Sequence, residues 1–341
     1  MNTRHAFGID MGTGSVKIYD RNKDTILEEI NMIAVRDRDT VFAVGNDAYE
    51  LFEKNPDDIQ LIMPMKNGRI QDVLMMEAIL HTLLRKCSGY AGFIPVLFFS
   101  VPLDMTELER RAYSTIAKKG RFRRSKIFFV EKPIADAISI GIPLKKTDGT
   151  MVVNIGEENT EVSIIAEGRI LISRQLDLGG QSFDSSIISG VIRRNGLTIS
   201  QRTAQRLKFT LSDLTDEKKE GCKVGGIDKE TGLPRDGIVS SYTVSSSVEE
   251  VLSRIAEEIS RLLERIPPQI VTSIRNNGVF LTGGGTHVPG IDRYLRVKLD
   301  YPVRVSRHYE RGTVIGLKRI IEHTELQRWA TAPAKRTNSI R

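Results

Sequence analysis

The chain contains one short unit twice, and this duplication constrains its fold more than any other feature. The stretches FGIDMGTGSVKIYD (residues 7–20) and MVVNIGEENTEVSII (residues 151–165) each run from an apolar strand through a glycine turn into a second strand. Aligning them places Asp10 on Asn154, two residues before a glycine in each unit. Such a repeat predicts two similar halves that face each other across a cleft, with one hairpin from each half.

Strands and helices alternate around both units, and this order predicts an α/β core in each half. Apolar residues recur at helical spacing over residues 70–86 and 247–266. Thr106, followed three residues later by Glu109, has the pattern of a capping box at the start of a further helix. The 341 residues, 40% of them hydrophobic, are enough for two domains or for one divided domain.

Composition excludes several classes of protein. The two cysteines, Cys87 and Cys222, have no CxxC spacing, which excludes a zinc ribbon and a disulfide framework. The histidines are scattered without metal-ligand spacing, so we expect no metal site beyond a nucleotide's Mg²⁺. No signal-peptide region is recognisable, and no apolar run approaches the roughly 20 residues of a membrane-spanning helix. We therefore expect a soluble cytosolic protein with reduced thiols.

Two glycine-rich turns have the composition of phosphate-binding loops. Asp10 ends an apolar strand and is followed by the turn Gly12-Thr13-Gly14-Ser15. Glycines let the backbone approach phosphate, hydroxyls add donors, and a carboxylate holds water around Mg²⁺. The strand GVFLTG runs into Gly283-Gly284-Gly285-Thr286, which we expect to lead into a helix N-terminus favourable to anions. A turn like the first is, by itself, more often an ordinary hairpin. A nucleotide site is favoured because the second hairpin and the glycine turn at residues 283–286 occur in the same chain.

These elements resemble the MreB family of bacterial, actin-like, rod-shape-determining proteins. The likeness includes stretches without catalytic chemistry, among them AVGNDAYEL, MPMKNGRIQDVLMMEAIL and GIDKETGLPRDGIVSS. The stretch IPPQIVTSIRNNGVFLTGGGTHVPGID, which contains the later glycine turn, is similarly close. It runs from about Phe7 to His323 with the spacing kept. The resemblance implies the superfold shared by actin, Hsp70 and sugar kinases. In this α/β fold each of two lobes has a mixed sheet with flanking helices, and ATP with Mg²⁺ binds in the nucleotide cleft between them.

The resemblance also implies how the chain divides. The first lobe would cover residues 1–140, with an outer subdomain at about 31–75. The second lobe would cover residues 141–325, with an outer subdomain at about 180–250 and a last helix that returns toward the first lobe. The segment that remains, residues 326–341, is rich in cations, and we expect a basic, disordered tail there.

By the same likeness, the nucleotide site draws on both hairpins, one helix and the later glycine turn. Asp10 is the position that would hold Mg²⁺ through water. The residues matching the family's nucleotide-binding positions are Gly12, Thr13, Gly14, Ser15, Gly156, Glu158, Asn159, Thr160, Gln205, Arg206, Lys208, Gly283, Gly284, Gly285 and Thr286. His287 matches a leucine beside the family's adenine pocket, where it would either stack or fill space.

Several matching positions carry different chemistry in this chain. The family's second hairpin reads Asp-Ile-Gly-Gly-Gly-Thr-Thr-Glu, whereas residues 154–161 read Asn-Ile-Gly-Glu-Glu-Asn-Thr-Glu. Asn154 thus replaces an aspartate that shares the metal's water shell, and Asn159 replaces a threonine that helps to place the attacking water. Lys132 replaces the second glutamate of the family's Glu-Glu-Pro motif, which polarises this water, and Gln205 replaces a glutamate on the nucleoside side.

These changes all act against hydrolysis. A lysine ammonium cannot accept a hydrogen bond from water, and hydrolysis needs an acceptor and a metal. A carboxylate 4 Å from a phosphate charge costs about 1 kcal/mol in water and about 4 kcal/mol at an effective dielectric of 20. We also expect backbone strain if the turn needs positive φ at Glu157 or Glu158. Lys132 could pair with either glutamate, or the two carboxylates could bind the metal directly. We therefore expect that ATP can bind and that hydrolysis is weak or lost. No residue is assigned a catalytic role.

A membrane contact is also implied by the family. Its apolar membrane loop matches SGYAGFIP at residues 88–95, where Phe93 and Ile94 would insert; the alternative is that both residues begin the buried strand that follows. KKGRFRRSK, at residues 118–126, holds six cations and contributes much of the net charge of +7. We expect this run to be a solvated helix end, which would assist at an anionic membrane only if it shared a face with the loop. No aromatics interleave with it as a stacking platform would need, and we therefore expect no nucleic-acid partner.

The resemblance predicts a cytoplasmic protein, peripheral to the inner membrane face, that forms head-to-tail filaments and organises cell-wall synthesis for cell shape. Its partners would be copies of itself, other MreB-like proteins and the cell-wall elongation machinery. Without hydrolysis it could be a regulatory partner of a conventional family member. Two other classes stay open. A kinase of the same superfold would need a substrate-side base, which the matched segments do not show, and a DNA-segregation filament would use the basic patches.

Overall fold

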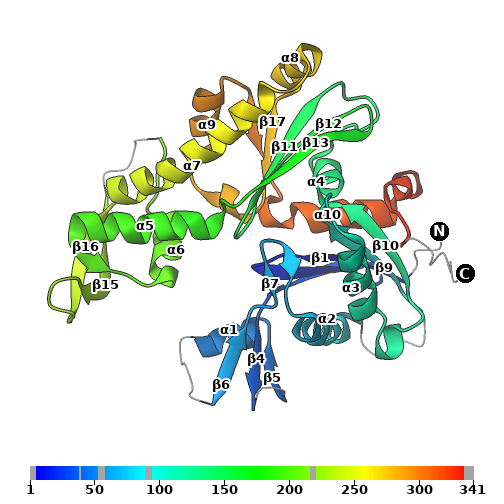
Figure 1. The fold of residues 1–341 in the computed structure, drawn as a ribbon, viewed down its shortest axis with the longest axis horizontal. Coiled ribbons are helices and arrows are strands. Elements are labelled where there is room, and N and C mark those ends of the chain that lie inside the picture. The colour runs from blue at the N-terminus through cyan, green and yellow to red at the C-terminus, as the bar shows by residue number, and fades with distance from the viewer. Residues whose placement is uncertain (1–4, 38–39, 53–57, 89–93, 216–219, 334–341) are drawn as a thin grey trace, which may run out of the picture. The chain divides into compact units, whose positions relative to one another are not determined.

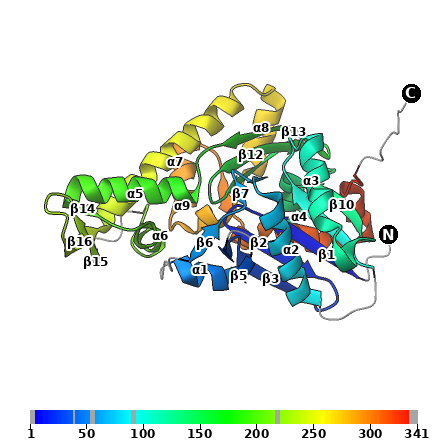
Figure 2. The same cartoon turned by 60° about the horizontal axis from the view of Figure 1, so that its bottom comes forward.

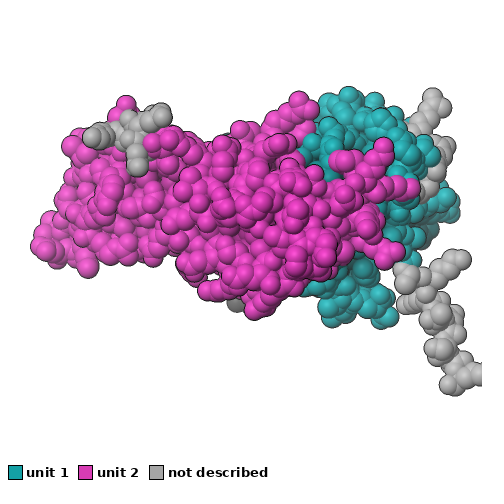
Figure 3. Space-filling model, turned by 90° about the horizontal axis from the view of Figure 1, so that it is seen from above, with its two compact units in different colours: residues 1–142, 311–341 teal, residues 143–310 magenta. Residues whose placement is uncertain are grey.

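The chain folds into two compact units, coloured separately in Figure 3. Unit 1 comprises residues 1–142 and 311–341, and unit 2 comprises residues 143–310. Residues 311–325, which the sequence prediction assigned to the second lobe, therefore belong to unit 1. The computed structural model describes residues 5–37, 40–52, 58–88, 94–215 and 220–333.

Unit 1 is built on a five-stranded sheet in the order β10-β9-β1-β2-β3 (Figure 1). Its strands are β1 (Ala6–Met11), β2 (Ser15–Asp20), β3 (Thr25–Ile30), β9 (Val96–Val101) and β10 (Lys126–Glu131). β1, β9 and β10 are parallel, whereas β1, β2 and β3 pair as antiparallel hairpins. Every residue of β1 and β9 is buried, as expected of parallel strands that are covered on both faces.

Helices cover both faces of this sheet (Figure 2). The covering helices are α2 (Val73–Ser88), α3 (Glu107–Ala117), α4 (Lys132–Ile140) and α10 (Gly312–Glu322). Phe7 and Ile9 share a core with α2 and α3, whereas Gly8, on the opposite face, lets α10 approach: a Cβ there would lie 3.0 Å from the Cβ of Leu317. The capping box of Thr106 and Glu109 is confirmed at the start of α3.

Smaller elements complete unit 1. A three-stranded sheet in the order β5-β4-β6 packs with one short helix. These elements are β4 (Ile33–Arg36), β5 (Thr40–Val44), α1 (Asn46–Phe52) and β6 (Ile59–Ile62). A separate two-stranded hairpin, β7 (Met65–Lys66) with β8 (Arg69–Ile70), leads into α2. The tip of this hairpin contacts the first glycine turn, as described below.

Unit 2 repeats the sheet topology of unit 1. Its strand order is β13-β12-β11-β17-β18, again an antiparallel meander of three strands with two parallel strands added beside the first. The strands are β11 (Thr150–Ile155), β12 (Thr160–Ala166), β13 (Arg169–Leu176), β17 (Val279–Thr282) and β18 (Val303–Val305). The two sequence units identified above therefore occupy equivalent places, as β1–β2 and β11–β12.

The rest of unit 2 is largely helical. Its helices are α5 (Gly180–Asn195), α6 (Gln201–Thr210), α7 (Ser241–Leu263), α8 (Pro268–Asn277) and α9 (Ile291–Leu299). A small sheet contains β14 (Leu197–Thr198), β15 (Gly221–Asp228) and β16 (Pro234–Ser240). α7 begins six residues before the predicted start at residue 247, because the Ser240 side chain accepts a hydrogen bond from the Thr243 N–H and caps the helix.

The expected disorder from residue 326 is wrong for the part of the tail that the structure describes. A 3₁₀ helix, η4 (Thr324–Trp329), follows α10, and Gln327 within it is buried. Thr331 then pairs with Phe129 through two backbone hydrogen bonds of 2.8 Å on the outer edge of β10. Residues 334–341 lie outside the described part. Within the described residues, no helix is long and apolar enough to cross a membrane.

Candidate functional site

The first hairpin joins β1 and β2 through a tight turn in unit 1. The Gly12 N–H donates to the Ser15 carbonyl at 2.9 Å and closes the turn. Asn31, which follows β3, holds it: its Nδ2 donates to the Gly12 carbonyl at 2.8 Å, and its N–H donates to the Gly14 carbonyl at 3.0 Å. Neither glycine has positive φ. They therefore serve here by leaving the backbone uncovered, rather than by permitting an unusual conformation.

Asp10 lies at the end of β1 and is only 5% exposed. It accepts a hydrogen bond from the Ser100 hydroxyl at 2.6 Å. Opposite it on β2 stands Lys17, which is also buried. The Lys17 ammonium donates to the Ser15 hydroxyl at 2.6 Å and lies 3.5 Å from the Glu28 carboxylate. Sequence reasoning did not single out Lys17, although a lysine within an apolar strand, opposite the candidate metal position, was a usable signal.

Thr13 and Lys132 also belong to unit 1. Thr13 is buried, and its hydroxyl accepts a hydrogen bond from the Gly68 N–H at 2.9 Å, so the tip of the β7–β8 hairpin rests on the glycine turn. Lys132 is the first residue of α4. Its ammonium adds to the positive end of the helix macrodipole, and it cannot serve as a hydrogen-bond acceptor for water.

The second hairpin, in unit 2, is a regular turn despite its two glutamates. β11 and β12 stay in register up to the pair Ile155–Thr160, and the Gly156 N–H donates to the Asn159 carbonyl at 2.8 Å. Neither Glu157 nor Glu158 has positive φ, and nor does Asn159. The backbone strain expected from replacing glycine is therefore absent. The condition under which strain was expected, a turn that needs positive φ at Glu157 or Glu158, is not met.

The second hairpin rests on the N-terminus of α5. The Gly180 N–H donates to the Gly156 carbonyl at 2.9 Å, and the Gln181 N–H donates to the Glu157 carbonyl at 2.8 Å. Amides at a helix N-terminus lack partners within the helix. The turn carbonyls supply those partners here, so the conformation of the turn and the position of α5 depend on each other.

Gly179 makes this contact possible. A Cβ at residue 179 would lie 2.6 Å from the Glu158 carbonyl carbon and 2.7 Å from the Asn159 nitrogen, both of them backbone atoms. The Thr160 hydroxyl adds a further link by donating to the Leu178 carbonyl at 2.6 Å. Thr160, a predicted nucleotide-binding residue, is thus fully buried and has a partner within the chain.

The Glu157 side chain lies beside a buried ion pair. Lys208, in α6, is 1% exposed; its Nζ lies 2.8 Å from Oδ1 of Asp184 and donates to the Gly180 carbonyl at 3.1 Å. Glu157 Oε2 and Lys208 Nζ lie 3.4 and 3.5 Å from the position that a Cβ would take at Gly180. Burial raises the pKa of both Glu157 and Asp184, and the Lys208 charge opposes that effect. The cluster therefore holds two carboxylates around one ammonium.

Asn154 borders the later glycine turn. It is 6% exposed and pairs in register with Thr282 of β17. A Cβ at Gly283, whose φ is 93°, would lie 2.6 Å from Asn154 Oδ1 and 2.3 Å from the Ile155 carbonyl oxygen. Glycine is therefore required where the chain leaves β17. An amide at residue 154 places no negative charge next to this turn, unlike the aspartate of the resembling family.

The segment after Gly283 differs from the prediction. We expected a helix N-terminus directly after the glycines, but residues Gly284–His287 form a single 3₁₀ turn, η2, and α9 begins only at Ile291. The Thr286 hydroxyl donates back to the Gly283 carbonyl at 2.6 Å and holds this turn together. Backbone amides are thus gathered in a short turn rather than at the end of a long helix.

His287 belongs to an aromatic cluster. Its ring stacks on Tyr309, with centroids 4.1 Å apart and planes inclined by 14°, and meets the Phe209 ring edge-on at 6.1 Å. Its Nε2 contacts the Glu310 carboxylate. The ring thus stacks on Tyr309 within the chain, and its role beside an adenine stays a prediction. Sequence reasoning missed both Tyr309 and Phe209, which carry no motif. Gln205 and Arg206 precede Phe209 on α6.

Metal binding by a carboxylate cluster gains no support. Among the described residues, no group of three or more His, Cys, Asp or Glu side chains could hold a metal ion. Glu157 lies beside Lys208, whereas Asp10 is a buried carboxylate of the kind that holds a Mg²⁺ ion through water. The buried, hydrogen-bonded Asp10 fits that role.

Part of the membrane prediction lies on described residues. Ile94 is 53% exposed and precedes β9, so the alternative that it belongs to the buried strand is wrong. Phe93 lies outside the described residues. The basic run at residues 118–126 is exposed except for Phe122 and Ser125.

Comparisons with known proteins agree with this geometry. The family described as MreB/Mbl protein matches residues 4–328. The cell shape-determining protein MreB of Escherichia coli K12 is 33% identical over 307 residues, which cover 87% of this chain and 88% of that protein. The crystal structure of MreB5 of Spiroplasma citri bound to ADP matches with a TM-score of 0.88 and 25% identity over 96% of this chain and 98% of that one. A MamK double helical filament matches with a TM-score of 0.77 and 16% identity over 93% and 98%. The predicted actin-like fold is confirmed.

Proposed function

Because the chain belongs to the MreB/Mbl family, we propose that it is an actin-like cytoskeletal protein that assembles into filaments and takes part in determining cell shape. The observation that carries this proposal is the extent of the likeness, which spans residues 4–328 and so includes both units. The structural neighbours include a filament of the same fold. A head-to-tail contact that does not close into a ring is the interface type that such a filament requires.

We further propose that the protein binds ATP with Mg²⁺. Each unit has a hairpin whose turn is closed and held by neighbouring residues, through Asn31 in unit 1 and through the N-terminus of α5 in unit 2. Preorganised turns of this kind present backbone amides to phosphate. Asp10 supplies the carboxylate for the metal's water shell, and Lys17 supplies a buried positive charge beside the first turn. A structural neighbour, MreB5, carries ADP.

Hydrolysis is proposed to be impaired. Phosphoryl transfer to water depends on a group that orients the water and on charge that stabilises the transition state. Lys132 cannot accept a proton from water, and Asn154 brings no charge to a metal. These losses concern the chemical step alone, because the turn that holds Glu157 and Glu158 is unstrained and the Glu157 carboxylate lies beside Lys208. Binding without turnover is the expected result.

A filament without turnover lacks the change of nucleotide state that normally limits filament lifetime. We therefore propose a stable or regulatory filament, formed alone or together with a conventional MreB-like protein and serving the cell-wall elongation machinery. Its location would be cytoplasmic, at the inner face of the membrane. Ile94, an exposed aliphatic residue outside any strand, is the described residue that favours a membrane contact.

Sedimentation and negative-stain electron microscopy of the full chain test the proposed assembly. Filaments are expected with Mg-ATP and with a non-hydrolysable analogue alike, since assembly would not need turnover. Mixing with a conventional MreB-like protein tests copolymerisation. A protein that stays monomeric under all of these conditions, alone and with the partner, would contradict the proposal.

A further inference from the structure

We propose that one edge of unit 1 is a docking surface for the headgroups of anionic lipids. The surface, which we call the strand-start edge, consists of Lys23, Ile94, Arg123, Arg124 and Lys126, all exposed. The proposal rests on the membrane association proposed above. It adds the class of lipid that is recognised and the residues that select it.

The register of the sheet brings these residues together. β1, β9 and β10 are parallel, and Val96 lies between Ala6 on one side and Lys126 on the other. Because neighbouring strands are about 4.8 Å apart, the segments that lead into β9 and β10 leave the sheet side by side. Ile94 and Arg124 each lie two residues before this paired position. An exposed aliphatic side chain and a run of cations therefore share one edge.

Two other segments reach the same edge. β2 runs antiparallel to β1, so the turn after β2 lies where β1 starts. Lys23 in that turn donates to the Cys87 carbonyl in the last turn of α2, so α2 ends here as well. The last turn of α2 carries two further exposed cations, Arg85 and Lys86, of which Lys86 is paired with Glu29 at 2.9 Å.

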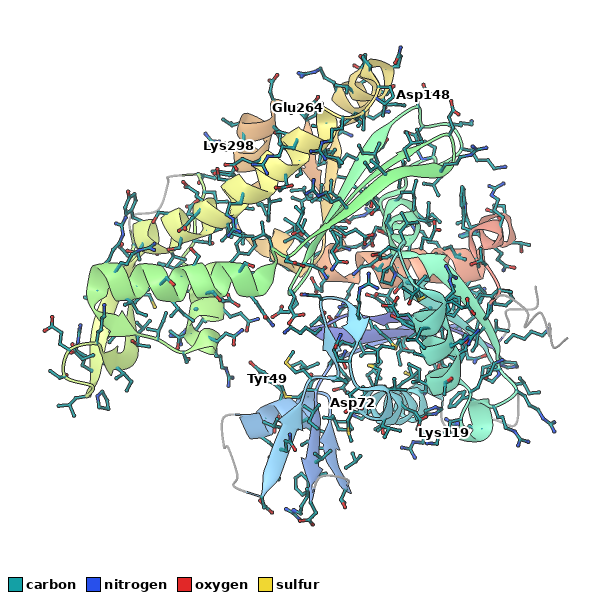
Figure 4. The ribbon with its side chains drawn as sticks, viewed as in Figure 1. Tyr49, Asp72, Lys119, Asp148, Glu264 and Lys298 are labelled. Carbon is teal, nitrogen blue, oxygen red and sulfur yellow. The ribbon has the colours of Figure 1, made fainter. Side chains whose placement is uncertain are left out.

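Positive charge at this edge is in clear excess. No acidic residue occurs between Thr115 and Val130, and the six cations of that stretch are all exposed: Lys118, Lys119, Arg121, Arg123, Arg124 and Lys126. The acids on neighbouring elements are already paired. Glu77 of α2 contacts Lys119 (labelled in Figure 4), and Asp24 contacts Lys318 at 2.6 Å. The charge of the remaining cations is therefore not cancelled locally.

The stabilisation of helix ends accounts for only some of these cations. Cations in the last turn of a helix interact favourably with its dipole, which accounts for Arg85, Lys86 and Lys118. Arg123, Arg124 and Lys126 follow a separate 3₁₀ turn and close no α-helix. That turn is fixed by Phe122, which is 2% exposed and packs 5.5 Å from the His81 ring. Burial of Phe122 leaves the cations on either side of it at the surface.

The combination with Ile94 favours a bilayer over nucleic acid. An exposed aliphatic side chain gains free energy by entering the acyl-chain boundary and gains nothing from a phosphate backbone. Base recognition would use exposed aromatic rings, and the one aromatic residue of the basic run, Phe122, is buried.

A vesicle-binding experiment with the full chain tests the proposal. The probes are vesicles of phosphatidylcholine, with and without phosphatidylglycerol, at low and high salt. Each Lys or Arg near an anionic surface strengthens binding about fivefold, so the triple variant R123E/R124E/K126E is expected to lose at least about 100-fold in affinity for anionic vesicles. High salt should also lower the affinity of the wild-type chain for anionic vesicles. The control variant R254E/K298E/R304E carries the same charge change on exposed positions of unit 2 and should bind like wild type.

A second pair of variants tests the apolar contribution. Ile94→Ser should weaken binding to the anionic vesicles, whereas Leu74→Ser, which removes an exposed aliphatic residue at the opposite end of α2, should not. Circular dichroism and sedimentation of filaments confirm that each variant is folded and assembles. The filament readout separates this proposal from the proposed function.

Three outcomes would overturn the inference. If wild type binds neutral and anionic vesicles equally and the triple variant does so as well, membrane association survives but the cationic edge does not select the lipid. If filaments form but bind no vesicles, neither the membrane association nor the edge is supported. If the triple variant binds vesicles normally but loses salt-sensitive retention of duplex DNA, the edge is a nucleic-acid surface instead.

Discussion

Glu157 differs from the residue that the MreB family has at this position, yet the backbone of its turn is regular. It stands where the resembling family has glycine, yet its φ is not positive and its carbonyl accepts a hydrogen bond from the Gln181 N–H. Its carboxylate lies beside Lys208 and Asp184. The residue therefore changes the electrostatics of a buried cluster without changing the path of the turn.

Neutralising Glu157 should stabilise the protein at neutral pH. A carboxyl whose pKa is raised on folding binds its proton more tightly in the folded state, so ionisation disfavours folding. This penalty is absent below the ordinary glutamate pKa of about 4.3 and grows as the pH rises through the raised folded value. Glu157→Gln should therefore melt at a higher temperature than wild type at pH 7 and at the same temperature near pH 4.

The matched control is Glu264→Gln, at an exposed carboxylate just after α7 that is labelled in Figure 4. Its melting temperature should follow wild type at both pH values. A Glu157→Gln variant that is less stable than wild type at pH 7 would show that the carboxylate is needed as a partner for Lys208 and would contradict this interpretation.

Lys208 should be essential for stability. Its side chain and that of Asp184 are each 2% exposed, and removing one partner of a buried ion pair typically costs about 3–5 kcal/mol. Lys208→Met should lower the free energy of unfolding by that amount in urea denaturation. Lys223→Met breaks an ion pair of similar length, 2.9 Å, between exposed side chains and should change stability little. Equal effects of the two substitutions would refute the structural role of Lys208.

At the scale of elements, the second hairpin and α5 form one structural unit. Gly179 allows them to touch, since a Cβ there would lie within 2.8 Å of three backbone atoms of the turn. Gly179→Ala should destabilise the protein by about 1–3 kcal/mol and lower its nucleotide affinity, measured by urea denaturation and calorimetry. Gly225→Ala is the control, because its Cβ would meet nothing closer than 3.6 Å. Unchanged affinity in Gly179→Ala would separate the hairpin from nucleotide binding.

Elements with a local signal could be predicted, and those that depend on distant packing could not. Thr106 and Glu109 lie within one turn of each other, so the capping box was visible in the sequence. The start of α7 was missed because its first residues, SYTVSSS, are rich in small polar side chains. Ser247 is nevertheless buried, because Gly190 of α5 lets it approach closely. No local pattern reveals such a contact between two helices.

The same distinction holds for the candidate site. The two hairpins were predictable because each is a continuous motif, and the duplicated sheet topology follows from them. The ion pair of Lys208 with Asp184 joins residues on two helices, and the stack of His287 on Tyr309 joins residues 22 positions apart. The orientation of Glu157 depends on the first of these contacts. Sequence comparison could mark the residue as unusual but could not say where its charge would lie.

At the scale of the whole molecule, the altered positions should act together to suppress turnover. Restoring the family's residues with Lys132→Glu, Asn154→Asp, Glu157→Gly, Glu158→Gly and Asn159→Thr should raise phosphate release at least about 100-fold, the lower range for a well-placed acid–base group. Adding Asp10→Ala should abolish that gain, which controls for contaminating ATPase. A folded, nucleotide-binding variant that releases no more phosphate than wild type would show that other residues suppress hydrolysis.

The most direct measurement follows bound nucleotide and released phosphate in one sample of the wild-type chain with Mg-ATP. We expect calorimetry to detect saturable binding while phosphate stays at the level of a protein-free control. Sustained release over many turnovers, at a rate near that of the restored variant, would contradict the proposal that this chain keeps the nucleotide hairpins but not their hydrolytic chemistry.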